Sequence, residues 1–284
     1  MEELKQLSYI PSQFIFTNLP VKCPNKNQII YKKEYGDKVK VSITMMGENG
    51  IPGGRYARLL MCLFTTEAVV RKEKKVILEY ANIREVLKKI KLPSSRGKEI
   101  KEQLDRFAKC KVTIEIKYKE ENKENKEKIK VEGVNNMLFI QNYIKITVRK
   151  RKTNEERIII EFTTDFTEVA QNHAVPIDYD IYANIKSPLG NDLYSWFVYK
   201  NNGYIGQEGL FVSRRQLLEQ FNKENQNEPQ AYEWITQQIK TIKEKHYPGL
   251  NVNIHKDFSG ITLYKSVQVI QSKDIRYIPI IYKD

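Results

Sequence analysis

The chain has 284 residues, the length of about two ordinary domains, and 40% of them are hydrophobic, which excludes a disordered chain. Lysine and arginine number 48 against 35 aspartate and glutamate residues. The resulting net charge of +13 favours a polyanionic partner such as DNA, RNA or an anionic membrane. The longest apolar run, residues 59–64, is far shorter than the ~18 residues that span a bilayer, and the N-terminus lacks a signal-peptide pattern. We therefore expect a cytoplasmic protein with no membrane partner.

The N-terminal part of the chain predicts an arm followed by a buried helix. Residues 1–36 contain Pro11, Pro20, Pro24 and a polar stretch, so we expect an arm with little regular structure. Apolar residues then recur at three- and four-residue spacing over 55–71, which predicts a largely buried helix.

Two short helices come next, one over 82–90, with Asn82 as its expected cap, and one ending near residue 109, joined by a turn at 92–95. Such a pair is a helix-turn-helix candidate. Segments rich in β-branched and aromatic residues follow at 112–118, 128–131, 137–140, 144–148 and 157–162. Helices followed by a strand ribbon are typical of a winged helix. We therefore predict a first winged-helix domain over 37–155, for dimerisation and DNA backbone contacts.

The tract 117–132 within this ribbon holds six lysines and five glutamates and predicts a solvated hairpin tip rather than a phosphate-binding wing. The second half of the chain repeats the arrangement loosely, with helices at 188–199, 214–221 and 230–246 and strands at 210–212, 252–255 and 261–264. We predict a second winged-helix domain over 156–284 that does most of the DNA reading. The expected fold class is α+β, with two tandem winged-helix domains.

The residue types that catalysis requires do not come together in the sequence. Residues 47–55 are glycine-rich but lack the lysine of a phosphate-binding loop. His173, His246 and His255 are isolated from one another, whereas a metal-dependent nicking centre needs two histidines close together beside a tyrosine nucleophile. The three cysteines are widely spaced and predict neither a disulfide framework nor a zinc site. We expect no catalytic residue, no metal and no cofactor.

Hydroxyl and basic residues gather at two expected helix starts, where free backbone N–H groups favour a phosphate. They are Ser95, Arg96 and Lys98 in the first domain and Arg214, Arg215 and Gln216 in the second, where Ser213 is the expected cap of the helix. Lys101 lies on the same helix as Lys98. Acidic neighbours on that helix leave a structural or dimer-forming role open there.

The helix at 230–246 has a polar outer face, because Ala231, Ile235 and Ile239 face inward by helical spacing. The candidates for DNA contact on this face are Tyr232, Thr236, Gln237, Lys240 and Lys243. Threonine and glutamine can exchange hydrogen bonds with base edges, and lysine can bind guanine or phosphate.

Several segments resemble the plasmid-encoded RepA replication initiators, a family of theta-type, iteron-binding Rep proteins. In chain order they are 54–60 (GRYARLL), 65–69 (TTEAV), 95–97 (SRG), 173–178 (HAVPID), 187–196 (SPLGNDLYSW) and 247–249 (YPG). The helix that starts at Ser187 is the most specific of them, since it combines a particular cap with a particular aromatic set. The Lys/Glu-rich insertion at 120–127 departs from the family pattern and enlarges the expected first wing.

The resemblance implies a protein that binds directly repeated origin sites in double-stranded DNA and opens adjacent AT-rich DNA. It also implies loading of the host initiator and replicative helicase, and repression of the protein's own gene by a homodimer. Two other interpretations stay open at this point. One is a stand-alone winged-helix transcriptional regulator, and the other is a metal-dependent rolling-circle nickase, which a chelator would inactivate.

Overall fold

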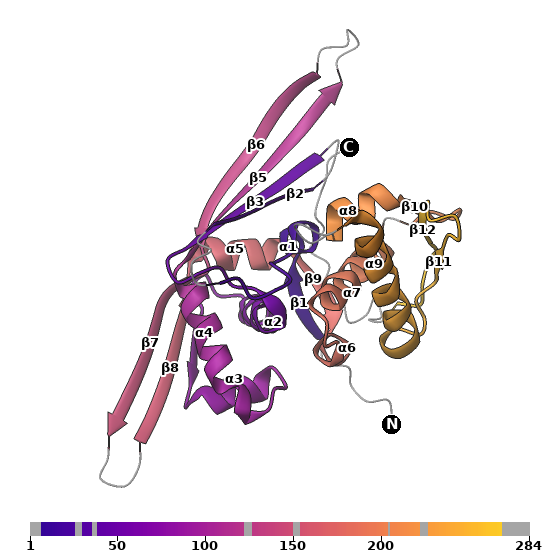
Figure 1. The fold of residues 1–284 in the computed structure, drawn as a ribbon. Coiled ribbons are helices and arrows are strands. Elements are labelled where there is room, and N and C mark those ends of the chain that lie inside the picture. The colour runs from indigo at the N-terminus through magenta and orange to yellow at the C-terminus, as the bar shows by residue number, and fades with distance from the viewer. Residues whose placement is uncertain are drawn as a thin grey trace. The chain divides into compact units, whose positions relative to one another are not determined.

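The structure of the chain, a computed structural model, describes residues 7–25, 30–35, 39–121, 127–149, 154–203, 205–221 and 227–268 (Figure 1). Two compact units form within these ranges. Residues 7–10 and 175–268 make up unit 1, and the described residues between 11 and 174 make up unit 2. No helix in the described ranges is long and apolar enough to cross a membrane.

Unit 2 is built around helix α2 (Gly54–Arg71), in which every residue from 57 to 65 is buried. Aromatic rings pack edge to face against it. Phe64 of α2 lies 5.5 Å from Phe107 and 5.2 Å from Phe162, measured between ring centroids. Helix α5 (Thr164–His173) adds Phe166, whose ring centroid is 5.3 Å from that of Phe162. The predicted buried helix is thus confirmed, and these rings form the core of unit 2.

The helix-turn-helix of unit 2 consists of α3 (Ile83–Lys89), the short 3-10 turn Ser94–Arg96 and α4 (Gly97–Ala108), and strand β4 (Ile77–Tyr80) leads into it. Asn82 caps α3, because its side-chain oxygen accepts hydrogen bonds from the backbone N–H groups of Arg84 and Glu85. The predicted helix pair and its cap are confirmed.

The strands of unit 2 form two antiparallel sheets. The first contains β2 (Ile30–Tyr35), β3 (Val39–Gly47), β5 (Cys110–Glu121) and β6 (Glu127–Leu138) in the order β2-β3-β5-β6. The second contains β4, β7 (Ile140–Arg149) and β8 (Asn154–Phe162) in the order β4-β8-β7. Figure 1 shows the hairpins β5–β6 and β7–β8 extending in opposite directions within this unit.

Unit 1 begins with β1 (Leu7–Pro11), which pairs with β9 (Ala174–Asp178), and continues through helices α6 (Tyr179–Asn184) and α7 (Pro188–Asn201). Strand β10 (Leu210–Ser213) then precedes helices α8 (Arg214–Phe221) and α9 (Glu228–Thr241), and a π-helical turn, Ile242–His246, extends α9. Strands β11 (Val252–Ile254) and β12 (Gly260–Leu263) complete a sheet of order β10-β12-β11. Trp196, Phe197 and Phe221 pack at the centre of this unit.

The two units share one order of elements. In each, a long helix, a short strand and two helices follow one another, and two later strands complete a sheet in which the last strand lies between the other two. Unit 2 differs by an insertion, because β5 and β6 stand between its second helix, α4, and the strands β7 and β8. Thus α7, β10, α8, α9, β11 and β12 correspond to α2, β4, α3, α4, β7 and β8. The α+β class is confirmed. The tandem winged-helix assignment stays a prediction, which this common topology supports.

Three features differ from the sequence-based expectations. The prediction of an irregular N-terminal arm is wrong for residues 7–17 and 30–35, which form β1, helix α1 (Ser12–Thr17) and β2. Strand β1 pairs with the distant β9, and β2 pairs with the neighbouring β3. The start of unit 1 at Val175 lies beyond the expected boundary after residue 155, since β8 is needed to complete the sheet of unit 2.

The third difference concerns the first wing. The Lys/Glu-rich insertion lies on hairpin β5–β6, and this hairpin pairs with β3 instead of enlarging the sheet that follows the helix-turn-helix. The hairpin in the wing position is β7–β8. The tip of the insertion, residues 122–126, lies outside the described residues.

Candidate nucleic-acid interface

The start of α8 in unit 1 is fixed by a reciprocal cap. The side-chain oxygen of Gln216 accepts hydrogen bonds from the backbone N–H of Ser213 at 2.9 Å and from its hydroxyl at 3.2 Å. In return, the backbone N–H of Gln216 donates to the Ser213 hydroxyl oxygen at 3.2 Å. The side chain of Gln216 therefore caps the start of α8. It is also exposed, so it can contact a ligand bound at this helix start.

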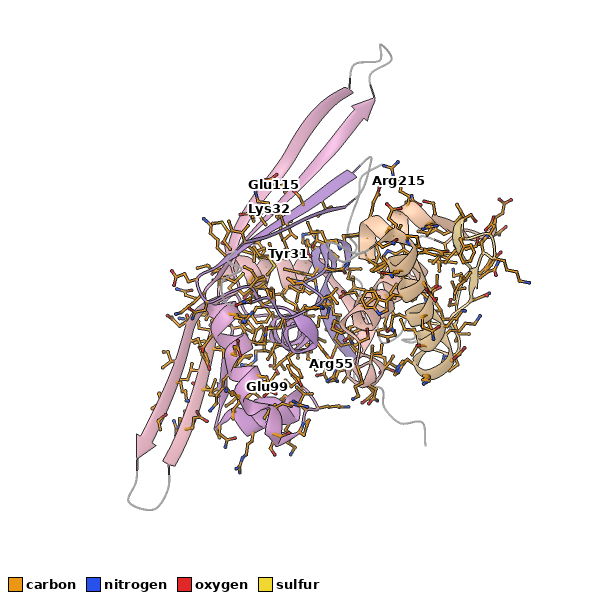
Figure 2. The ribbon with its side chains drawn as sticks, in the orientation of Figure 1. Tyr31, Lys32, Arg55, Glu99, Glu115 and Arg215 are labelled. Atoms are coloured by element: carbon orange, nitrogen blue, oxygen red, sulfur yellow. The ribbon has the colours of Figure 1, made fainter. Side chains whose placement is uncertain are left out.

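The two arginines at this helix start have different surroundings. Arg215 is strongly exposed, its side chain being 83% accessible, and it forms an ion pair with Glu219 at 2.8 Å (Figure 2). Arg214 is half-buried, and its guanidinium carbon lies 5.3 Å from the centre of the Tyr232 ring in a cation–π contact. A surface ion pair such as that of Arg215 costs little to exchange for a phosphate.

Helix α9 presents the polar face that its spacing predicts. Ala231, Ile235 and Ile239 are buried, whereas Gln237 and Lys240 are exposed on the opposite face. The half-buried Thr236, also on this helix, donates its hydroxyl proton to the Glu233 backbone carbonyl at 2.9 Å. The helix therefore offers an amide and an ammonium group within one helical turn, which is a combination that can contact both bases and phosphates.

Tyr232 does not lie on this exposed face, and its predicted exposure is wrong. Its side chain is only 3% accessible, and its hydroxyl donates to the Gly260 carbonyl at 3.1 Å. Burial raises the pKa of Tyr232 above its usual value, so the hydroxyl keeps the proton that it donates. The reason for the burial is the β11–β12 hairpin, which covers this side of α9 and which helical spacing alone does not reveal.

Lys243 lies beyond the α-helical part of the predicted helix, in the π-helical turn Ile242–His246. It is exposed, and its ammonium group donates to the Val252 backbone carbonyl at 3.3 Å. The side chain thus links the end of the helix to the first strand of the hairpin. A π-turn changes the direction in which side chains point, so Lys243 does not continue the row of Gln237 and Lys240.

In unit 2, the predicted residues at the start of α4 are exposed but lie among acids. Ser95, Arg96 and Lys98 are all exposed, and Arg96 forms an ion pair with Glu99 at 2.9 Å. The hydrogen bond to Arg96 is the largest of the effects that lower the pKa of Glu99. The carboxylate next to this helix start therefore stays charged and opposes an incoming phosphate.

Lys101 of α4 is tied to the wing-position hairpin. Its ammonium group and that of Lys145 on β7 each lie 2.9 Å from the same carboxylate oxygen of Glu156 on β8. Partial burial raises the pKa of Glu156, but the two lysines together outweigh it and hold the pKa below its usual value. The sequence analysis missed Lys145 and Glu156, because residues so far apart in sequence give no local signal of their pairing.

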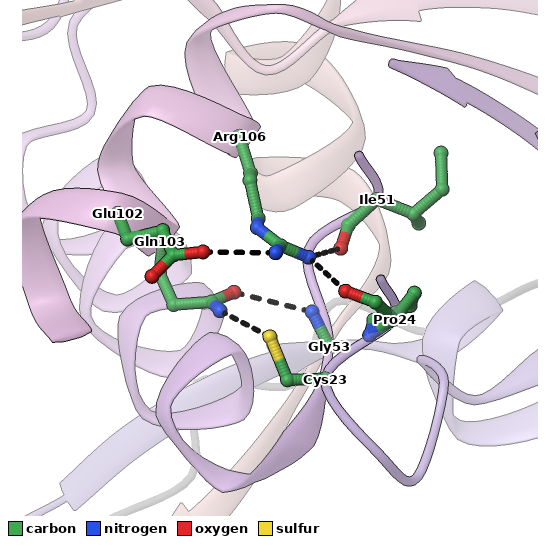
Figure 3. Close-up of polar contacts among 7 residues, drawn as sticks. All are labelled: Cys23, Pro24, Ile51, Gly53, Glu102, Gln103 and Arg106. Carbon is green, nitrogen blue, oxygen red and sulfur yellow. Dashed lines mark hydrogen bonds and ion pairs between the residues drawn. The ribbon is translucent and has the colours of Figure 1, made fainter. Parts of the chain in front are cut away.

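Behind α4, a group of buried hydrogen bonds holds the helix against the segments before α2 (Figure 3). One guanidinium nitrogen of Arg106 donates to the carbonyls of Pro24 at 2.8 Å and Ile51 at 2.9 Å. The other lies 2.9 Å from the carboxylate of Glu102. Only 3% of the Arg106 side chain is accessible. The sequence analysis also missed this residue, because a charged side chain such as that of Arg106 is expected to face the solvent.

Gln103 and Arg58 extend these contacts, and we call the set of Arg58, Gln103 and Arg106 the carbonyl clamp. Gln103 accepts from the Gly53 backbone N–H at 3.2 Å, next to the start of α2. Arg58 donates to the backbone carbonyls of Leu19 and Pro20 at 2.6 and 2.9 Å. Gln103 and Arg106 therefore fix the back of α4, and Arg58 fixes α2 to the segment before it.

The groups that catalysis by a metal would need do not come together in the described part of the chain. No set of three or more histidine, cysteine, aspartate or glutamate residues there could hold a metal ion. His173 ends α5, His246 ends the π-turn, and His255 follows β11. The imidazole of His255 lies 2.8 Å from the Thr262 hydroxyl, which gives it a role in the hairpin.

Comparison with known proteins adds a family and a fold. The family model described as plasmid-encoded RepA protein matches residues 51–210, which is more than half of the chain. No curated protein matches the sequence. The crystal structure of selenomethionine derivatives of domain 2 and domain 3 of RctB has a TM-score of 0.53 and 14% identity, covering 86% of this chain and 89% of that chain. A second crystal structure of RctB domains 2-3 has a TM-score of 0.49 and 15% identity, covering 84% and 87%. At such identity, the first likeness concerns the fold alone.

Proposed function

The chain belongs to the family of plasmid-encoded RepA proteins, which are replication initiators, and from this premise we propose that it binds directly repeated sites in a plasmid origin sequence-specifically. Binding then promotes opening of the adjacent DNA and loading of the host initiator and helicase, and a homodimer represses the protein's own gene. The observation that supports this proposal best is the helix pair that each unit combines with a three-stranded sheet of matching strand order, together with the exposed polar face of α9 in unit 1.

Unit 1 is the principal reader in this proposal. The α8–α9 pair places Gln237, Lys240 and the half-buried Thr236 on the recognition helix, with Arg214 and Arg215 at the start of the preceding helix. The helix enters the major groove, where a glutamine can pair with adenine and a lysine with guanine. The arginines bind the phosphates beside it and set the position of the helix.

Unit 2 supports binding in another way. Ser95, Arg96 and Lys98 lie at the start of α4 and contact the DNA backbone, whereas Lys101 is held by Glu156 and stays with the hairpin. Acidic partners beside these cations weaken their pull on phosphate. We therefore assign to unit 2 the backbone contacts and the self-association that precedes repression.

The test compares duplex DNA flanking the protein's own gene with mixed-sequence duplex DNA of equal length. Lys240→Ala is expected to weaken binding to the gene-flanking DNA about tenfold, and mixed-sequence binding less, because a bidentate base contact discriminates by ~1–3 kcal/mol. Lys74→Ala removes the same charge from the exposed turn after α2 and is the matched control.

Two outcomes decide the proposal. Selective loss of affinity for the gene-flanking DNA in the Lys240 variant, with the Lys74 variant unchanged, supports α9 as the reader. Equal binding of wild type and the Lys240 variant to both DNAs refutes it. A single protected site at the promoter, without repeats, would instead favour a stand-alone transcriptional regulator.

A further inference from the structure

The hairpin of unit 1 carries an exposed phenylalanine at its tip. The loop His255–Ser259 joins β11 to β12, and Phe258 in this loop is 64% exposed. Its φ is 60°, in the left-handed region that side chains other than glycine rarely adopt. A large apolar side chain in this conformation, at the end of a wing-position hairpin, has no role in the core of unit 1.

Hydrogen bonds hold the loop around Phe258 in place. The Phe258 N–H donates to the His255 carbonyl at 3.2 Å, and the His255 N–H donates to the Gly260 carbonyl at 3.1 Å. The Asp257 carboxylate accepts from the backbone N–H and the hydroxyl of Ser259 at 3.1 and 2.8 Å. The exposed ring is therefore presented by an ordered turn, and its presentation costs little entropy on binding.

The same loop touches both helices of the reading pair. The ring centroid of Phe258 lies 6.4 Å from that of Tyr232 on α9, and the guanidinium carbon of Arg214 lies 5.3 Å from the same Tyr232 ring centre. The backbone N–H of Arg214 donates to the Ser259 carbonyl at 2.7 Å. The start of α8, the first turns of α9 and the loop are thus in direct contact with one another.

We infer that Phe258 is an apolar wedge that enters the minor groove beside the major-groove site of α9 and partly unstacks one base step. This inference rests on the proposed DNA binding of unit 1 and adds to it a residue that deforms the DNA. Apolar side chains inserted between base steps are an established means of kinking a duplex. Within this proposal, the deformation favours opening of the neighbouring origin DNA.

Charge and area identify the occupant as DNA. Lys256 in the loop is exposed, and the half-buried Arg214 contacts the ring of Tyr232, which lies next to Phe258. The hydrogen bonds from Ser259 hold the pKa of Asp257 below its usual value, so this carboxylate stays charged, but the two cations outnumber it. These cations suit a phosphate backbone. A single phenylalanine buries about 200 Å² of surface in a contact, whereas a stable protein–protein interface buries ~800 Å² of surface on each partner. The loop is therefore too small to bind a second copy of this chain or another protein stably.

The test uses the full-length protein and the duplex that the wild type protects beside its own gene. Phe258→Ala is expected to lower affinity about tenfold, whereas Phe258→Leu, which keeps a wedge, stays within about threefold. The salt dependence of binding stays the same in both, because an apolar contact releases no counterions. Duplexes with 2-aminopurine at each adenine of the site report unstacking as a rise in fluorescence, which the Ala variant abolishes.

Phe211→Ala is the matched control. Phe211 on β10 is a 51% exposed phenylalanine of the same unit, and its ring lies 5.5 Å from the ring of His255 at the start of the same loop. Its removal therefore controls for the loss of an exposed aromatic ring beside the loop. We expect wild-type affinity and wild-type fluorescence for it. Phe258→Gly, which suits the positive φ, is expected to keep or raise the thermal midpoint and still lose affinity, so that folding and binding are separated.

The outcomes separate this inference from the proposed function. If the wild type protects no DNA, both fall together. If the wild type binds and the Phe258→Ala protein binds as tightly with the same fluorescence rise, the wedge is refuted and the DNA-binding proposal stands. An equal loss in the Phe211 and Phe258 variants also refutes the wedge, since it would show a general effect of exposed apolar area.

Discussion

Replacement of Arg106 by alanine tests whether the carbonyl clamp stabilises unit 2. The change removes donors to the buried carbonyls of Pro24 and Ile51, and each orphaned group costs ~1–3 kcal/mol. Part of this is offset, because the buried Nε of Arg106 has no hydrogen-bond partner in the described part of the chain and its desolvation is relieved. We expect a net loss of about 3 kcal/mol, a large share of the ~5–15 kcal/mol that stabilises a typical domain.

Urea denaturation followed by far-UV circular dichroism measures this loss. Circular dichroism is used because tryptophan fluorescence would report on unit 1, where Trp196 and Trp234, the only tryptophans of the sequence, lie. With a slope of ~2 kcal/mol per molar urea, the transition midpoint of unit 2 should fall by about 1.5 M. Arg106→Met keeps the packing of the aliphatic part of the side chain but removes its hydrogen bonds, so it separates the two contributions to stability. An unchanged midpoint in the alanine variant, equal to that of the exposed-site control Arg96→Ala, would refute the clamp.

Three further predictions concern charge, pH and backbone. Glu156→Gln frees the two lysines paired with it, so it should tighten binding to any duplex. The dependence of the binding affinity on salt should become steeper by about one to two released ions, as titration at several salt concentrations would show. Because the folded pKa of Glu156 is lowered, its charged form stabilises the fold above the unfolded pKa of about 4.3, and this stabilisation is lost as the pH falls through the folded pKa. The stability difference between wild type and this variant should therefore shrink as the pH falls below the unfolded pKa; a constant difference contradicts this. In Gly260→Ala the new Cβ would lie 2.2 Å from the Val212 carbonyl, and we expect a loss of about 2–4 kcal/mol in urea denaturation, whereas Gly206→Ala, with nothing within 4 Å, should be neutral.

Local patterns in the sequence were sufficient to predict the helices of both helix-turn-helix pairs. The apolar spacing of α4 and α9 and the caps at Asn82 and Ser213 depend only on neighbouring residues, and the structure confirms them. The inward side chains Ile235 and Ile239 are likewise buried as expected. Features of this kind are encoded within one or two helical turns.

Features that depend on distant partners could not be predicted in this way. The sequence does not reveal that β8 pairs with β4 and β7 while β5 pairs with β3, because strand pairing is set by tertiary packing. For the same reason Tyr232 was expected on the surface, although the hairpin buries it. The buried arginines of the clamp give no sign of their burial, since their partners are backbone carbonyls of segments far away in the chain.

A footprint of the purified full-length protein on the DNA flanking its own gene tests the central claim most directly, when it is done at two salt concentrations and repeated with a chelator. Sequence reading by α9 of unit 1 and backbone contacts by unit 2 predict directly repeated protected units of ~20 bp that weaken with salt and do not respond to the chelator. A metal-dependent nick with the protein left covalently on one strand, or protection that shows no preferred sequence, would contradict the account.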